Sequence, residues 1–107
     1  MIKISLILVA AFVATPASAK PYHSPVGVWV TTDYGSCDEP NAYVSYRHVR
    51  TPAYFTGRVT SIPMRKNGDY EIHIQGEDYI LMADVTATTA RMITPWNGMH
   101  EYQLRRC

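Results

Sequence analysis

Four histidines are the side chains of this sequence best suited to hold a metal ion or to move a proton: His23, His48, His73 and His100. No two of them are spaced as His-x-His or His-x₃-His, which would bring two imidazoles to one ion. The five methionines are equally dispersed, and we expect them to fill the core rather than to bind copper. We therefore expect neither a metal site nor a cofactor.

The serines and carboxylates form no catalytic pattern either. Hydrolysis needs an activated nucleophile, a base and donors for the developing oxyanion, and no serine stands in the context of a nucleophile elbow. The adjacent pairs Asp38-Glu39 and Glu77-Asp78 fall in expected turns, where carboxylates usually solvate a loop. A carboxylate pair for glycoside cleavage could be assembled only by the fold, so we predict that the chain is not an enzyme.

Two cysteines, Cys37 and Cys107, carry the remaining chemistry. An even number of cysteines in an exported chain predicts a disulfide. Closing a loop of roughly 70 residues stabilises a fold by about 4 kcal/mol in the chain-entropy model, and it ties down a terminus that would otherwise fray. Free thiols or a redox pair are the alternative, although the sequence contains no Cys-x-x-Cys motif.

Export is indicated by the first nineteen residues. Lys3 precedes an apolar run from Ile4 to Val13, and the small residues Ala17 and Ala19 stand at the −3 and −1 positions of a cleavage site after Ala19. The apolar run is too short to span a membrane, which takes about 20 residues. We expect a signal peptide at residues 1–19, no stable membrane anchor, and a periplasmic or secreted protein.

Composition limits the remaining function classes. The chain has 107 residues and a formal net charge of +1, which suits one small domain. A nucleic-acid-binding module would carry a basic excess, so we expect no nucleic-acid partner. Hydrophobic residues make up 47% of the chain, which is typical of a folded domain rather than a disordered segment.

The elements that must position these side chains are predicted to be strands and turns. In the segments between turn-forming residues, apolar and polar side chains alternate along the chain. This alternation indicates seven strands, at 26–32, 42–49, 55–66, 69–74, 79–86, 88–94 and 99–106. Pro63 predicts an edge position or a bulge, and Asn67-Gly68 predicts a type I′ hairpin turn. We predict an all-β domain at 26–107, a small antiparallel meander barrel of about seven to eight strands, after an extended arm at 20–25.

Both ends of this domain resemble the calycins, the lipocalin-type barrels. Gly27-Val28-Trp29 opens the first strand, and Arg105-Arg106 lies near the end of the last. The resemblance implies that Trp29 plugs one end of the barrel. It also implies that Arg105 or Arg106 stacks across the indole as a cation–π lid.

Within that group, small bacterial periplasmic inhibitors are similar in size. The run from Gly27 to Val30, followed by Cys37, is similar to the opening of the periplasmic metalloprotease inhibitors. This resemblance implies that the arm, Lys20 to Pro25, blocks the cleft of a target protease. Periplasmic lysozyme inhibitors of the small-barrel type are similar in shape.

The most basic and aromatic segment lies between residues 43 and 54. Tyrosine and arginine are favoured at the energetic centres of protein interfaces, so we interpret this segment as a candidate binding surface for a protein or an anionic glycan. Ordinary cross-strand pairing of tyrosine with arginine is the alternative. A turn-tip tryptophan is a further candidate, either exposed for contact or folded back on the core. The candidate surface comprises Tyr43, Tyr46, Arg47, His48, Arg50, Tyr54 and Trp96.

These observations predict an exported, non-catalytic binding protein with a protein partner. The leading hypothesis is an inhibitor of a periplasmic or host hydrolase, of the protease or lysozyme type. One alternative is a lipocalin-like carrier of a small apolar ligand, and another is a structural or virulence-associated envelope component. An interior filled by side chains favours the binding protein, whereas an apolar cavity above about 300 Å³ favours the carrier.

Overall fold

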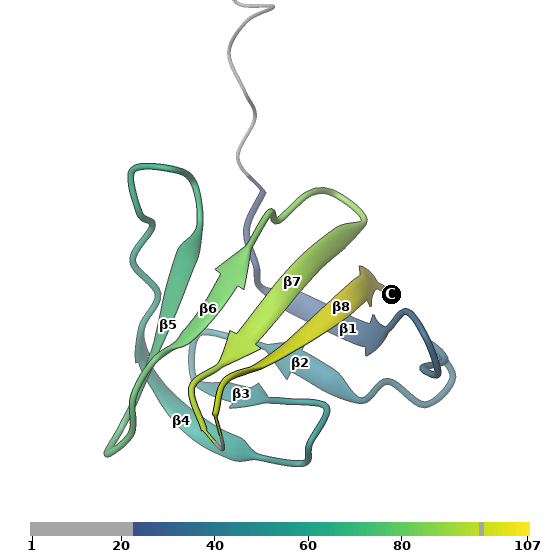
Figure 1. Cartoon of the computed structure of the whole chain (residues 1–107), viewed down its shortest axis with the longest axis horizontal. Coiled ribbons are helices and arrows are strands. Elements are labelled where there is room, and N and C mark those ends of the chain that lie inside the picture. Colours follow the sequence, from purple (N-terminus) through teal and green to yellow (C-terminus); the bar gives the residue numbers. More distant parts are fainter. Residues whose placement is uncertain (1–22, 97) are drawn as a thin grey trace, which may run out of the picture.

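The computed structural model describes residues 23–96 and 98–107, and they form a closed barrel of eight antiparallel strands (Figure 1). Each strand pairs with the next along the chain, and β8 closes the ring on β1. The strands are β1 (Gly27–Thr31), β2 (Ala42–Val44), β3 (His48–Arg50), β4 (Thr56–Ser61), β5 (Tyr70–Ile74), β6 (Ile80–Ala83), β7 (Thr89–Thr94) and β8 (His100–Arg106). The predicted all-β meander barrel is thereby confirmed. The expected signal peptide and residues 20–22 of the expected arm lie outside the described residues.

The segment 42–49 forms two strands, so the prediction of a single strand there was wrong. Ser45 makes the hairpin: its hydroxyl accepts hydrogen bonds from the backbone N–H groups of Arg47 (3.3 Å) and His48 (2.9 Å). The backbone N–H of Ser45 donates to the carbonyl of His48 at 2.8 Å. A serine side chain that bonds to the backbone in this way stabilises a turn in place of an extended strand.

The hairpin at Asn67-Gly68 is present, but its turn type differs from the prediction. Gly68 has a φ of 95°, whereas Asn67 is not among the residues with positive φ. The N–H of Gly68 donates to the carbonyl of Arg65 at 3.0 Å, and the N–H of Arg65 donates to the carbonyl of Asp69 at 2.7 Å. This is the pattern of a three-residue loop with a bulge at glycine, rather than a type I′ turn.

The third predicted strand, 55–66, is shorter than expected because its ladder is interrupted. The pairing of β4 with β5 shifts register between Val59 and Ser61. Pro63 lies beyond the end of β4, where it lacks the N–H that a ladder requires. Its carbonyl still accepts a hydrogen bond from the backbone of Glu71 at 2.9 Å.

Large apolar side chains fill the inside of the barrel. In β5 and β7, the side chains that point inward are mostly buried and those that point outward are mostly polar, as the two-residue period of a strand requires. The largest fully buried apolar side chains are Trp29, Ile72, Ile80, Met82, Met92 and Leu104. The expectation that side chains occupy the interior is met.

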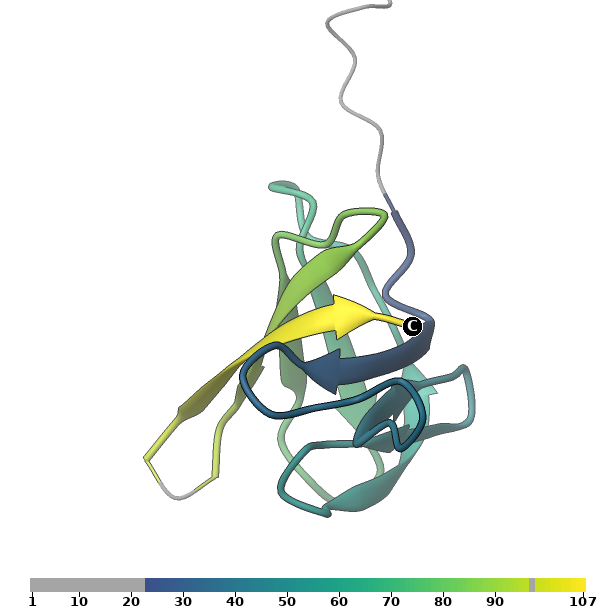
Figure 2. The same ribbon diagram turned by 90° about the vertical axis from the view of Figure 1, so that its right-hand side faces the viewer.

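A disulfide joins Cys37, in the β1–β2 loop, to Cys107. The Cα atoms are 5.4 Å apart, and the N–H of Cys107 donates to the carbonyl of Val28 at 2.9 Å. Figure 2 shows the C-terminus lying beside the start of β1. The predicted bond therefore fixes the end of the chain against the first strand. Among the residues that the structure describes, no helix has the length and apolar character to cross a membrane.

Candidate binding surfaces

Arg106, and not Arg105, covers Trp29. Its guanidinium carbon lies 4.2 Å from the centre of the Trp29 ring, and the two residues are partners across β1 and β8. The indole N–H of Trp29 donates to the carbonyl of Pro25 at 3.0 Å. Arg105 points to the outside of the barrel, where one of its nitrogens lies 3.6 Å from the sulfur of Cys37.

The guanidinium of Arg106 is also saturated with backbone acceptors. It donates to the carbonyls of Ser24 (2.8 Å), Val26 (3.0 Å), Thr86 (3.2 Å) and Ala87 (3.1 Å). Burial lowers the pKa of Arg106 from its usual range, which leaves an arginine charged at neutral pH. We call this end of the barrel, formed by the start of β1, the β6–β7 loop and Arg106, the closed end.

Gly27 allows the arginine to approach. Its φ is 154°, and a Cβ atom built there would lie 2.8 Å from a guanidinium nitrogen of Arg106. A side chain at this position would therefore force that nitrogen to shift, and it would also be strained at this φ. The Gly-x-Trp pattern therefore has a local physical reason in this chain.

The predicted binding surface is largely brought together on the outside of β2, β3 and β4. Tyr43 is the cross-strand partner of Arg50. The guanidinium of Arg50 lies 5.2 Å from the centre of the Tyr54 ring. Arg58 was not among the predicted residues, and the register of β3 and β4 places it opposite His48. We call this surface the basic face, and it consists of Tyr43, Tyr46, Arg47, His48, Arg50, Tyr54 and Arg58.

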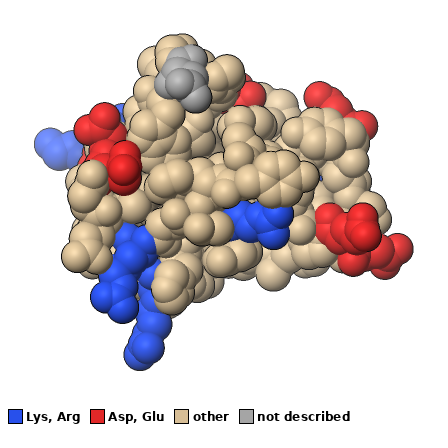
Figure 3. Space-filling view, turned by 90° about the horizontal axis from the view of Figure 1, so that it is seen from below, with Lys and Arg blue, Asp and Glu red and all other residues tan. Residues whose placement is uncertain are grey.

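The arginines of the basic face have no carboxylate partner within residues 23–96 and 98–107. This holds for Arg47, Arg50 and Arg58. By contrast, Arg65 pairs with Glu71 at 2.7 Å. Figure 3, which shows the molecule from below, shows a group of Lys and Arg side chains at one edge and several separate groups of Asp and Glu side chains around the outline. An acidic surface of a partner would supply the opposite charge that these arginines lack.

The other side of the barrel pairs its charges internally. Arg91 bonds to Asp84 at 2.7 Å and to Glu101 at 3.1 Å. The hydrogen bond from Arg65, followed by that from His73, lowers the pKa of Glu71 from its usual range. Surface ion pairs of this kind add little stability, but they occupy these arginines, which are then not free to bind the carboxylates of a partner.

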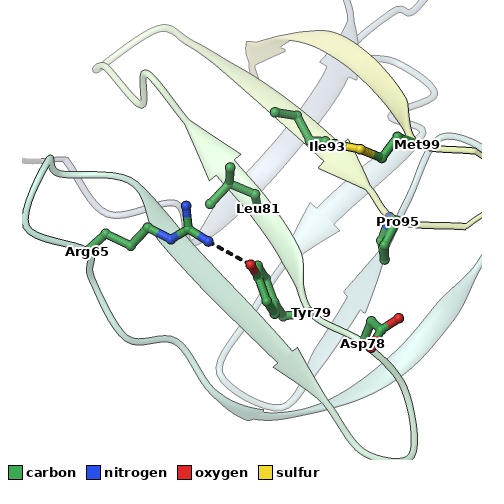
Figure 4. A pocket seen from close by; sticks show the side chains of 7 residues that line it. All are labelled: Arg65, Asp78, Tyr79, Leu81, Ile93, Pro95 and Met99. Carbon is green, nitrogen blue, oxygen red and sulfur yellow. Dashed lines mark hydrogen bonds between the residues drawn. The ribbon is translucent and has the colours of Figure 1, made fainter.

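An apolar groove of about 380 Å³ lies on the outside of β6 and β7 (Figure 4). Leu81 and Ile93 are cross-strand partners at outward positions, and the hydroxyl of Tyr79 accepts a hydrogen bond from Arg65 at 2.7 Å. The residues lining the groove are Arg65, Asp78, Tyr79, Leu81, Ile93, Pro95 and Met99. Sequence reasoning missed this groove, although apolar residues at outward strand positions could have signalled it.

Trp96 does not belong to the basic face. Its ring packs against Phe55 with ring centres 4.3 Å apart, and its indole N–H donates to Glu77 at 3.2 Å. The side chain is half-buried and packs against the core. Of the two possibilities for this residue, folding back on the core is the one observed.

Within the described part of the chain, no three His, Cys, Asp or Glu side chains are grouped as a metal site would require. His73 bonds to Glu71 at 2.8 Å, and His48 lies on the basic face. No protein-family model, curated protein or solved structure matches this chain. The reasons for regarding these surfaces as binding surfaces are therefore their geometry and their chemistry.

Proposed function

We propose that this protein is a non-catalytic binding protein that holds an acidic surface of a partner protein against its basic face. The observation that carries the proposal is the absence, among the described residues, of any carboxylate beside Arg47, Arg50 and Arg58. Complementary charge speeds association and selects the partner. The exposed tyrosines beside these arginines add contact area of the kind that anchors interfaces.

The partner that we propose is a hydrolase, which the protein inhibits by covering its cleft. A closed barrel with a disulfide is a rigid ligand, and rigidity limits the entropy lost on binding. The disulfide suits an oxidising compartment, in keeping with the signal pattern at residues 1–19, and the calycin-like barrel suits a small periplasmic or secreted inhibitor. Export and inhibition are both part of this proposal.

A carrier of apolar cargo has less support. The inward side chains of β5 to β8 fill the barrel, and Ile72, Met82 and Met92 are fully buried. The larger of the two pockets of 340–380 Å³ lies on the outside of the strands. The other opens at one end of the barrel and has polar residues in its lining. An apolar ligand would therefore have to displace the core in order to occupy the interior of the barrel.

The test is a charge reversal on the basic face with a matched reversal elsewhere. Arg47→Glu/Arg58→Glu and Lys66→Glu/Arg105→Glu change the net charge equally, and all four residues are exposed. Each variant and the wild type are used as bait in periplasmic extract and with purified proteases and lysozymes. We expect the first variant to lose at least tenfold in affinity for a captured hydrolase, and the second to retain it.

The enzyme assay and a heparin column decide between the alternatives. Inhibition by the wild type that weakens with salt and with Arg47→Glu/Arg58→Glu supports the proposal. Equal losses in both variants would show that net charge, rather than the basic face, governs binding. Retention on heparin without capture of any protein would assign an anionic glycan as the ligand and overturn the proposed protein partner.

A further inference from the structure

A second pocket, of about 340 Å³, opens at the end of the barrel opposite Arg106. It lies among the β3–β4 and β7–β8 loops and the strand ends next to them. Its lining residues are Thr51, Ala53, Phe55, Thr94, Trp96, His100 and Tyr102. We call it the mouth pocket. None of its lining residues belongs to the basic face, and the inference drawn from it does not depend on the proposed function.

Two buried threonines that line the mouth pocket have side-chain hydroxyls without a hydrogen-bond partner in the part of the chain that the structure describes. Thr51 is 1% exposed and Thr94 is 4% exposed. Neither side-chain hydroxyl bonds to any group in residues 23–96 or 98–107, although the backbone of Thr51 bonds to Phe55 and Tyr54. A buried polar group without a partner costs free energy, and such groups are rare in folded proteins. A ligand that offers hydrogen bonds would remove this cost.

The third buried threonine shows how the same side chain is normally satisfied. Thr31 is 3% exposed, and its hydroxyl accepts a hydrogen bond from the amide of Asn41 at 3.0 Å. Thr31 also lies where a strand ends toward the mouth, yet it does not line the pocket. Of the three buried threonines, the two that line the pocket, Thr51 and Thr94, are thus the ones whose hydroxyls have no partner among the described residues.

The two hydroxyls lie across the mouth from each other. Thr51 directly follows β3 and Thr94 ends β7, and these strands are four places apart in a ring of eight. The rings of Phe55 and Trp96 meet between the same two loops, and Glu77 fixes the indole through its N–H. A ligand in this pocket thus meets apolar ring surfaces and needs polar groups on two opposite sides.

We propose that the mouth pocket binds one ring of a neutral carbohydrate. A sugar ring carries hydroxyls around its rim and C–H groups on its faces, which matches hydroxyls on opposite walls and aromatic rings between them. His100 and Tyr102 add polar atoms without hydrogen-bond partners in the described residues, and no Lys, Arg, Asp or Glu lines the pocket. An apolar ring would leave the threonine hydroxyls unsatisfied, and a charged ligand would find no opposite charge.

The first measurement is an NMR titration of the protein with its Cys37–Cys107 disulfide intact. The probes are the methyl glycosides of glucose, galactose, mannose and N-acetylglucosamine, and a trisaccharide of N-acetylglucosamine. Phenol and cyclohexanol serve as rings without a polar rim. We expect at least one sugar to shift the indole N–H signal of Trp96 and the amide signals of Thr51 and Thr94. Binding by a monosaccharide glycoside indicates a free sugar as the source, and binding by the trisaccharide alone indicates a glycan chain.

The second measurement replaces each threonine with valine, which keeps the shape and removes the hydroxyl. Thr51→Val and Thr94→Val should each weaken sugar binding about tenfold. Both should leave the melting temperature of the free protein unchanged or higher, because each removes an unpartnered hydroxyl. Thr31→Val is the matched control: it should lower the melting temperature, because Asn41 loses its acceptor, and leave sugar binding unchanged.

Three results would overturn the proposal. The first is that no sugar shifts the signals of the lining residues. The second is that phenol or cyclohexanol binds more tightly than every sugar. The third is that Thr51→Val and Thr94→Val lower the melting temperature as much as Thr31→Val, which would show that both hydroxyls already have partners.

Discussion

The two ends of this barrel use their polar groups in opposite ways. At the closed end, Arg106 lies on Trp29 and donates to four backbone carbonyls. At the other end, the hydroxyls of Thr51 and Thr94 are buried without partners among the described residues. Proteins that leave buried polar groups unsatisfied usually do so at functional sites. The comparison therefore favours a stabilising role for the closed end and supports the proposed binding role of the mouth.

Two of the three described non-glycine residues with positive φ lie at the mouth. Tyr54 and Met99 have φ values of 67° and 66°, and both lie in loops at the mouth. They are also among the most exposed large side chains, at 76% and 67%. The left-handed conformation is costly for residues with a Cβ atom, and such strain is concentrated at binding sites. The third of these residues, Asp84, has a φ of 51° and lies near the closed end.

Removal of the disulfide should have the largest effect on stability. The double variant Cys37→Ser/Cys107→Ser should lose about 4 kcal/mol, because the unfolded chain regains the freedom of the long closed loop. Thermal and urea denaturation measure this loss, and wild-type protein with reductant is the control. An unchanged melting temperature would show that the closed end does not depend on this bond.

Loss of the arginine lid should have the next largest effect. Arg106→Met should cost about 3 kcal/mol, because four carbonyls lose a charged donor and Trp29 loses its cation–π contact. Arg105→Met is the matched control on the same strand, where an exposed arginine should cost less than about 0.5 kcal/mol. Urea denaturation compares the two variants. If both variants lost a similar amount of stability, the contacts of Arg106 at the closed end would contribute no more than those of an exposed arginine elsewhere on the barrel.

Relief of strain at the mouth should have the smallest effect, with the opposite sign. Met99→Gly should stabilise the protein by about 0.5 kcal/mol, because the left-handed penalty of about 1–2 kcal/mol exceeds the entropic cost of glycine, about 0.5–1 kcal/mol. Met64→Gly is the control, because Met64 is an exposed methionine whose φ is not positive. This substitution should lower the stability of the protein. A loss of stability in both variants would mean that the mouth holds no strain at Met99.

Local patterns in the sequence account for the class of the fold and for its closed end. The two-residue alternation along the strands and the short turns predict an antiparallel barrel, and two cysteines predict the disulfide. Trp29 and Arg106 lie near the first and last residues of the domain, so their contact follows once the ring closes. The hairpin at Ser45 was missed because the bonds of one hydroxyl outweighed a run of residues that favour strands.

The rest was decided by register and ring closure, which join residues that are distant in the sequence. Alternation assigns a side chain to one face, but it does not say which residue lies opposite. The pairing of β3 with β4 is what adds Arg58 to the basic face. In the sequence, Thr51 falls between two predicted strands and Thr94 ends another, and nothing marks either residue as part of a binding site. Only the closing of β8 on β1 sets them across one pocket, because the position of a strand around a barrel is a property of the whole ring.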